Sequence, residues 1–324
     1  MIERRAIGDR ATWLEWRSED MTASVGACLF GDDIHPYTSA FQQWAFHSGL
    51  WKPPPIDRKL IRRGEAIEKI APDLIRQERP DWNFVEPNRF YYRDPEARTG
   101  ATPDLVAQSD RGKGNAQVKS VGPQAFRRWK DRDTGETALP VWIAIQANIE
   151  AAFMEADWAA VVPITIGDSG LDIEIIDVPL KPALMDKFRL LAADFWRRVR
   201  EKEPYDVDWG KDAATILGMF ADDDGSVVDL TGDERMQVIL QQREQCKQIE
   251  ADGRSAEEHR RRLDAEIILK LGNARAARLD NGLIKAPTVK VKEAVRKAYS
   301  YRRISVTQYE TSSDDRSSES ESLA

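Results

Sequence analysis

Three polar residues near the middle of the chain have types and a spacing that suit phosphodiester hydrolysis. Asp104 follows a proline, twelve residues separate it from Gln117, and Lys119 comes two positions later. Side chains at positions i and i+2 of a strand point to the same face, so Gln117 and Lys119 should emerge side by side. If residues 100–108 pair with residues 116–121, Asp104 meets both of them from the neighbouring strand.

A carboxylate, an amide oxygen and a lysine at one strand end can share the work of hydrolysis. The oxygens hold Mg²⁺, which polarises the phosphate and lowers the pKa of its bound water. The lysine orients or deprotonates that water. The spacing by itself is common, and it leaves a second interpretation open, in which Asp104 is a turn residue and Lys119 lies on a solvated strand edge.

Helices and strands alternate around these residues in the manner of an α/β fold. Thr22 and Ser24 are suitable N-caps for a short helix, and Pro72 should kink or divide a longer one. The turns at 109–115 and 168–170 predict two hairpins. We expect helices over 24–30, 38–49, 57–79, 139–157 and 180–202, and strands over 83–85, 89–93, 100–108, 116–121, 159–167 and 171–178.

Six short segments between residues 12 and 200 form a wider pattern. They are Arg17–Ser24 (RSEDMTAS), Pro36–Ser39 (PYTS), Arg63–Glu68 (RGEAIE), Gly100–Asp104 (GATPD), Gln117–Lys119 (QVK) and Pro140–Gln146 (PVWIAIQ). In this order and with these gaps they resemble the YqaJ-type viral recombinase, or phage alkaline exonuclease, family of the PD-(D/E)XK nuclease superfamily. We therefore expect an α/β core, in which helices flank a central mixed sheet of about five strands and the active site lies at one edge of the sheet.

The resemblance implies a role for each matching polar residue of the core. Glu68 matches a helical acid that reaches the metal site, and a salt-bridged surface glutamate is the other interpretation. Asp104 matches the central metal ligand, and Lys119 matches the catalytic lysine. Gln146 matches a helical glutamine that contacts a DNA phosphate. The metal ligands implied for Mg²⁺ or Mn²⁺ are Glu68, Asp104 and Gln117.

Two further groups of residues are candidates for contacts with DNA. Arg17 and Ser24 match a pair that forms a pocket for a 5′-phosphate in exonucleases of this group, and Ser24 also suits an ordinary N-cap. Trp129 follows the lysine strand and could stack on a base, with Arg127 and Arg128 beside it for phosphates. The other interpretation of Trp129 is core packing.

Gln117 departs from the superfamily pattern, which usually has Asp or Glu at this position. A glutamine oxygen can ligate Mg²⁺ but brings no charge, so metal affinity should fall. Three interpretations follow: an active enzyme that tolerates glutamine, an inactivating Glu→Gln change, or a protein that binds DNA ends without cutting them. Retention of Glu68, Asp104 and Lys119 favours the first.

Composition narrows the class of protein. The 324 residues are 41% apolar and 32% charged, which excludes disordered, collagen-like and disulfide-scaffold classes. Cys28 and Cys246 are too few and too distant for a disulfide framework or a cysteine zinc site, which fits a reducing cytoplasm. The three histidines lack zinc-hydrolase spacing, and we find no secretory signal and no apolar run of membrane-spanning length.

The C-terminal part of the chain differs from the core. The net charge is −7, yet residues 275–303 hold nine basic residues against two acidic ones, which suits either DNA phosphates or a solvated face. Asn281-Gly282 predicts a hairpin there. The expected divisions are a nuclease domain over 1–203, an acidic linker or arm over 204–232, a helical and basic β-hairpin extension over 233–310 and a disordered acidic tail over 311–324.

The function expected is a Mg²⁺-dependent DNA exonuclease of phage or prophage recombination, acting 5′ to 3′ on duplex ends in the bacterial cytoplasm. Its single-stranded product would pass to an annealing protein, and the resemblance implies an oligomer, such as a ring around DNA. A non-catalytic scaffold that binds DNA ends and an endonuclease of the same fold are the alternatives.

Overall fold

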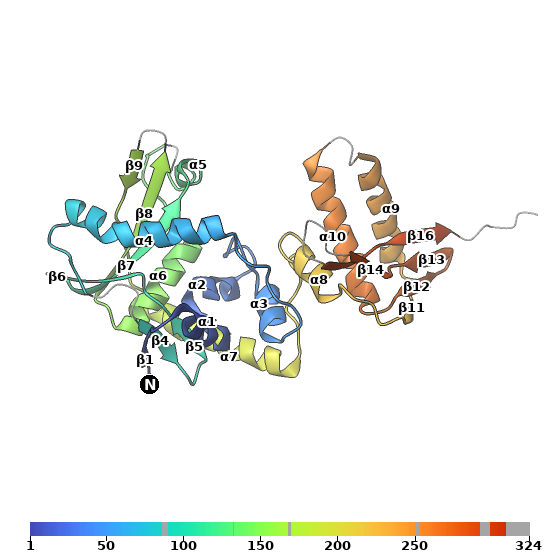
Figure 1. The fold of residues 1–324 in the computed structure, drawn as a ribbon, viewed down its shortest axis with the longest axis horizontal. Coiled ribbons are helices and arrows are strands. Elements are labelled where there is room, and N and C mark those ends of the chain that lie inside the picture. Colours follow the sequence, from blue (N-terminus) through green and yellow to red (C-terminus); the bar gives the residue numbers. More distant parts are fainter. Residues whose placement is uncertain (86–89, 132, 168–169, 250–252, 292–298, 309–324) are drawn as a thin grey trace, which may run out of the picture. The chain divides into compact units, whose positions relative to one another are not determined.

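The structure is a computed structural model that describes residues 1–85, 90–131, 133–167, 170–249, 253–291 and 299–308. The chain divides into two compact units, Met1–Lys211 and Asp212–Ala324 (Figure 1). The stretch 204–232, expected to be a linker or arm, contains helix α8 (Ala213–Met219) and strand β11 (Val227–Asp229), both in the second unit. The expected tail, 311–324, lies outside the described residues.

A mixed sheet of six strands forms the centre of the first unit, so the expected α/β fold is confirmed. Its order is β10-β8-β7-β6-β3, with β9 paired to β8. β6 and β7 form the expected antiparallel hairpin, and β7 and β8 run parallel. The strands are β3 (Asn83–Phe84), β6 (Leu105–Ser109), β7 (Gly112–Val121), β8 (Trp158–Gly167), β9 (Gly170–Ile173) and β10 (Ile176–Val178).

The alternating side chains of β7 face two different helices. Ala116 and Val118 pack against α4 in one core cluster. Asn115 donates its side-chain amide to a backbone carbonyl of α6 at 3.1 Å, so Gln117 and Lys119 lie on the α6 side as well. The expected position of the site, at a sheet edge, is wrong, because β6 and β7 lie inside the strand order. The two helices are α4 (Arg58–Glu78) and α6 (Val141–Met154).

Helix α4 continues through Pro72, which does not divide it as expected. Proline has no N–H to donate, so one helical hydrogen bond is lost. Ile67, Ala71 and Ile75 lie on either side of it and are almost completely buried against the sheet. Burial of one apolar stripe therefore holds the helix together across the proline.

A second, four-stranded sheet and the first helix bring the N-terminal segment to the site. Its order is β1-β4-β5-β2, and β5 leads directly to Asp104. Gly100 in β5 has no room for a side chain, because a Cβ there would lie 1.9 Å from the hydroxyl of Tyr91. The elements are β1 (Glu3–Ala6), α1 (Arg10–Glu19), β2 (Met21–Thr22), β4 (Phe90–Asp94) and β5 (Thr99–Ala101).

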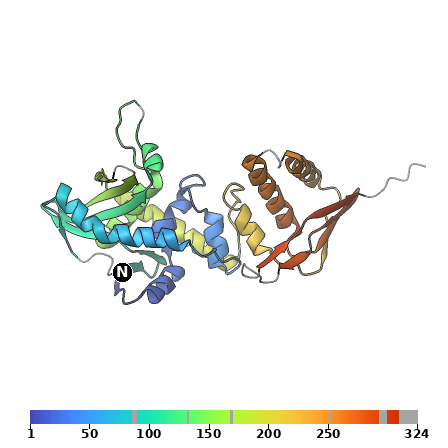
Figure 2. The same ribbon diagram turned by 45° about the horizontal axis from the view of Figure 1, so that its top comes forward.

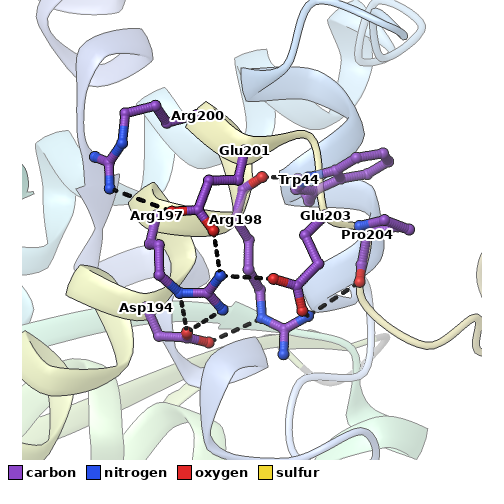
Figure 3. Close-up of polar contacts among 8 residues, drawn as sticks. All are labelled: Trp44, Asp194, Arg197, Arg198, Arg200, Glu201, Glu203 and Pro204. Carbon is purple, nitrogen blue, oxygen red and sulfur yellow. Dashed lines mark hydrogen bonds and ion pairs between the residues drawn. The ribbon is translucent and has the colours of Figure 1, made fainter.

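The helical side of the first unit ends in a network of ion pairs (Figure 3). Arg197 binds Asp194 at 2.8 Å and Glu203 at 2.6 Å, and Arg198 binds the same two carboxylates. The indole of Trp44 donates to the carbonyl of Arg198 at 3.3 Å, which fixes α3 to α7. The helices on this side are α2 (Ala23–Gly26), the 3-10 turn η1 (Ala27–Phe30), α3 (Ala40–His47) and α7 (Pro182–Glu201). The short helix α5 (Pro123–Arg127) packs instead against β8.

The second unit places the helices α9 and α10 on one face of a four-stranded sheet (Figure 2). Its order is β11-β12-β13-β16, and β14 pairs with β15 separately. The hairpin expected at Asn281-Gly282 is present as β12 and β13. Within the described ranges, no helix is both long and apolar enough to span a bilayer. The elements are α9 (Glu234–Ile249), α10 (Arg254–Leu271), β12 (Ala276–Leu279), β13 (Gly282–Lys285), β14 (Thr288–Val291), β15 (Tyr299–Arg302) and β16 (Ser305–Gln308).

Candidate active site

The β6–β7 hairpin brings Asp104 and Gln117 into direct contact. One carboxylate oxygen of Asp104 accepts a hydrogen bond from the backbone N–H of Val118 at 3.0 Å and another from the side-chain amide of Gln117. Burial raises the pKa of Asp104, against the opposing effects of Lys119 and these hydrogen bonds. The aspartate is therefore held firmly, in surroundings that favour its protonated form.

Lys119 is oriented by the helix that crosses the same face of the sheet. Its ammonium donates to the side-chain oxygen of Gln146 at 2.8 Å and lies 5.5 Å from the centre of the Trp142 ring. Gln146, for which the sequence predicted a contact with DNA, is in this structure the residue that fixes the lysine. Its position on α6 directs the ammonium into the space above Asp104 and Gln117.

Two residues that the sequence analysis missed, Asn115 and Glu150, complete this polar layer. Glu150 accepts hydrogen bonds from Gln146 at 2.8 Å and from Asn115 at 3.3 Å, and it is only 1% exposed. Burial, together with the charge of Asp104, raises the pKa of Glu150 to about 8. A glutamate inside the largely apolar helix VWIAIQANIEAAFM was a signal for a buried polar contact, as was the polar alternation at 115, 117 and 119.

Glu68 reaches the same space from α4. Glu68 is exposed, and it lines the same cavity as Asp104. Burial of its carboxyl group, with the nearby charges of Asp104 and Glu65, raises its pKa to about 7. Glu68, Asp104, Gln117 and Lys119 are called the acid–lysine cluster below.

Arg17 and Ser24 lie together on the wall contributed by the N-terminal segment. The guanidinium donates to the Ser24 hydroxyl at 2.7 Å and lies over the ring of Trp13 at 4.8 Å. Burial lowers the pKa of Arg17, although arginine remains charged at any physiological pH. Arg17 and Ser24 are called the arginine–serine pair below.

The position of Ser24 differs from the N-cap predicted for it. Thr22 occupies the N-cap of α2, which is only four residues long, and Ser24 lies within the helix. The backbone carbonyl of Ser24 instead accepts from Nε2 of His35 at 3.2 Å, while Nδ1 of the same ring accepts the backbone N–H groups of Tyr37 and Thr38. His35 therefore has a structural role, because its ring links the backbone at Ser24 to the backbone at Tyr37 and Thr38.

One cavity of about 650 Å³ joins the acid–lysine cluster to the arginine–serine pair. Gln146 and Glu150 also line it, and five acidic and three basic residues surround it in all. Three residues predicted to bind DNA, Arg127, Arg128 and Trp129, are not among the residues that line it. Trp129 is half-buried and packs against the core under α6 and against Phe126, with ring centres 5.5 Å apart, as its core interpretation requires.

The donors in this cavity fit a divalent cation held by oxygen atoms. The carbonyl oxygen of the Gln117 side chain is buried and has no hydrogen-bond partner among the described residues. Burial is the main cause of the raised pKa values of Glu68 and Asp104, so a cation bound beside them would favour their charged forms. In the described part of the chain no three Asp, Glu, His or Cys side chains meet as a metal cluster, so a cation here would need Gln117 as well.

Comparison with known proteins gives structural likeness only. No protein-family model matches the chain, and no curated protein matches its sequence. The crystal structure of the alkaline exonuclease LHK-Exo from Laribacter hongkongensis is similar over 60% of this chain and 94% of its own, with 16% identity and a TM-score of 0.45. The structure of LHK-Exo in complex with dAMP is similar over the same shares, with 18% identity and a TM-score of 0.44. What the chain does must therefore be read from the residues of the cavity.

Proposed function

We propose that the chain is a metal-dependent DNA exonuclease of the PD-(D/E)XK type, which degrades one strand of a duplex from its 5′ end. The observation that carries the proposal is the meeting of the acid–lysine cluster and the arginine–serine pair in one cavity. The first group suits cleavage of a phosphodiester, and the second suits a terminal phosphate. An enzyme that works at DNA ends needs both within the length of a nucleotide.

Glu68, Asp104 and Gln117 would hold Mg²⁺ or Mn²⁺ through their oxygen atoms. When bound, the cation supplies positive charge to the phosphate and lowers the pKa of a bound water. Lys119, held by Gln146, is within reach of the same space and orients or deprotonates the attacking water. Glu150 keeps the amide of Gln146 turned so that its oxygen, not its nitrogen, meets the lysine.

The arginine–serine pair binds the 5′-phosphate in this proposal. A guanidinium can contact two oxygens of a terminal phosphate, and the Ser24 hydroxyl adds a donor beside it. A terminal phosphate carries up to two negative charges and an internal phosphodiester carries one, so the pair favours ends. The resemblance to phage exonucleases supports a role in recombination in the bacterial cytoplasm, with an oligomeric enzyme and an annealing protein that receives the single strand.

Digestion of linear and covalently closed circular duplex DNA in Mg²⁺ tests this function. We expect loss of the linear form alone, and faster loss when the ends carry 5′-phosphates. Loss of both forms would move the chain to the endonuclease class. Loss of neither form, in Mg²⁺ and in Mn²⁺, would contradict hydrolysis altogether.

A second candidate, a scaffold that binds DNA ends without cutting them, is favoured by one contact. The amide N–H of Gln117 donates to Asp104, so the aspartate is satisfied without a cation. Replacement of Gln117 by glutamate distinguishes the two candidates. If the chain is an enzyme, Gln117→Glu should tighten Mn²⁺ binding by restoring a charge and should preserve cleavage. Cleavage that appears only in Gln117→Glu would support the scaffold for the unchanged protein.

A further inference from the structure

The second unit contains a positively charged cavity that the proposed hydrolysis does not use. The cavity, of about 490 Å³, lies between α8, the α9–α10 pair, the end of β15 and the segment that follows it. Six basic residues and one acidic residue, Asp264, line it. It is called the basic groove below, and its basic residues are Arg243, Lys247, Arg260, Arg261, Arg302 and Arg303.

Two of the arginines in the basic groove are structural. Arg243 is buried and binds Asp264, which also accepts from Arg260 at 2.7 Å. Arg302 donates to the carbonyl of Ala286 at 2.9 Å and to two carbonyls just after α10. These guanidinium groups hold the walls of the groove in place, because the carbonyls that end a helix have no partner inside it.

Three cations at the rim are available to a ligand. Lys247 and Arg261 are exposed, and the ion pairs they make with described residues are with surface glutamates one helical turn away on their own helices. Such pairs contribute little and exchange readily. Arg303 is exposed, and its guanidinium has no partner among the described residues. Groups of this kind can exchange water and small counterions for phosphate oxygens.

The rest of the lining is apolar or aromatic. Leu217, Phe220, Ile268 and Ile304 lie beneath the cations, and Tyr301 is 42% exposed at the rim. An apolar floor below a ring of positive charge matches a nucleotide, whose flat base is apolar on its faces and whose phosphate is anionic. An exposed aromatic ring beside basic side chains is a stacking platform for unpaired bases.

We propose that the basic groove binds single-stranded DNA, with phosphates on Lys247, Arg261 and Arg303 and a base against Tyr301. A duplex is disfavoured because its bases are stacked inside the helix, where Tyr301 cannot reach their faces. An acidic protein segment would use the cations but not the aromatic ring. The inference stands on the second unit alone and does not depend on whether the first unit cleaves DNA.

Binding of a short oligothymidylate to the full chain tests the proposal. The probe carries a 5′-hydroxyl and a 3′ fluorophore, and EDTA is present, so that cleavage and the 5′-phosphate contact do not contribute. The groove variant is Lys247→Gln, Arg261→Gln and Arg303→Gln. The matched control is Arg275→Gln, Arg278→Gln and Lys285→Gln, which removes the same charge from exposed positions outside the groove.

Fluorescence anisotropy at several salt concentrations gives the outcome. Each lost contact to a single-stranded phosphate should reduce the slope of log K against log salt by about 0.7. The groove variant lacks three such contacts, so its slope should be smaller by about 2. The control variant should keep the slope of the unchanged protein. Equal losses in both variants would overturn the proposal, because a diffuse field rather than a groove would then hold the strand.

Replacement of the aromatic ring separates a nucleic acid from other anions. Tyr301→Leu should weaken oligothymidylate binding by about tenfold and leave the salt slope unchanged, because stacking carries no charge. Polyglutamate binding should not respond to this change. Photo-crosslinking of an iodouracil oligonucleotide should label a peptide that contains Tyr301, and labelling confined to the first unit would overturn the proposal even if all variants fold poorly.

Discussion

Carboxylates in two regions of the first unit have opposite surroundings. At the end of α7, the hydrogen bond from Arg197 lowers the pKa of Glu203 (Figure 3). Burial opposes a lower pKa for Asp194, but hydrogen bonds from Arg197 and Arg198 lower it overall. In the cavity, burial raises the pKa of Glu68 to about 7 and of Glu150 to about 8. Arginines pair with the first group of acids. In the second group burial outweighs the neighbouring positive charges, although Glu150 still accepts hydrogen bonds from Gln146 and Asn115.

The difference separates acids that stabilise the fold from acids that serve a ligand. Paired surface carboxylates contribute modestly to stability and need nothing further. Buried carboxyl groups near one another disfavour the charged form, and a fold keeps them when a cation or a proton is part of the function. The cavity is therefore the part of the first unit in which added positive charge should change stability and activity most.

The largest effect is expected from Asp104→Asn. The change removes the central oxygen ligand, so cleavage should fall by roughly a thousandfold or more. The rise in Tm that Mn²⁺ produces in the unchanged protein should vanish as well, which differential scanning fluorimetry measures without any cleavage. Asp110→Asn, in the exposed turn of the same hairpin, is the matched control and should retain both. A full Mn²⁺ response in Asp104→Asn would place the cation elsewhere.

Arg17→Gln should have the next largest effect, and on one substrate only. Loss of a charge-assisted contact weakens binding by about 1.5–3 kcal/mol, or roughly ten- to a hundredfold. Degradation of duplex with a 5′-phosphate should slow by this factor, whereas slow cutting at 5′-hydroxyl ends should persist. Arg63→Gln, exposed on α4, should behave like the unchanged protein. Equal rates on both ends before any substitution would remove the basis for a phosphate pocket.

The pH dependence of Tm in Glu150→Gln tests whether the buried carboxyl group of Glu150 titrates. The pKa of Glu150 is raised from 4.5 to about 8, with the Asp104 charge adding to burial and Lys119 opposing it. The folded state therefore keeps a proton that the unfolded state releases, so stability should fall as the pH rises from about 5 to about 8. The amide variant cannot ionise, and its Tm should fall less over this range. The remaining slope comes from the other carboxyl groups whose pKa values are raised, Glu68, Asp104 and Asp20. Identical Tm profiles for the two proteins would show that Glu150 does not titrate there.

The smallest effect is expected at the ion pairs of α7. Arg197→Gln breaks exposed contacts with Asp194, Glu201 and Glu203 that water and salt already weaken. Its Tm should drop slightly in low salt, and high salt should remove the difference. The Mn²⁺ response and the pH profile above pH 5 should be unchanged. A change in either would mean that the ion pairs of α7 affect the carboxyl groups of the cavity, and the two groups would then not be independent.

The sequence predicts well what depends on local periodicity. Two apolar runs around a Gly-rich turn predicted the hairpin that carries Lys119, and the i, i+2 rule placed Gln117 beside the lysine. Asp104 was expected within a strand over 100–108, but it lies just before β6. The resemblance to a known family also indicated that Arg17 and Ser24 lie together at the site, and both line the same cavity. Each of these inferences needs only the geometry of one strand pair or one matched motif.

Contacts between elements distant in the sequence were not predictable in the same way. Glu150 and Asn115 meet only because α6 crosses the face of β7, and neither residue is part of a recognised segment. Pro72 was expected to kink or divide α4, but the helix is not divided, because burial of its neighbours against the sheet outweighs the lost hydrogen bond. Trp129 could not be assigned without knowing which core lay beneath it.

The most direct test of the proposed function is the rate of nucleotide release from a 5′-phosphorylated duplex end by the unchanged protein and by Lys119→Met. The substitution removes the ammonium that Gln146 orients but keeps a long unbranched side chain. In Mg²⁺ the unchanged protein should release nucleotides, and Lys119→Met should be slower by about 10²–10⁴-fold. Lys69→Met, on the exposed part of α4, should match the unchanged protein. Equal rates for Lys119→Met and the unchanged protein, or release without any divalent cation, would contradict the account.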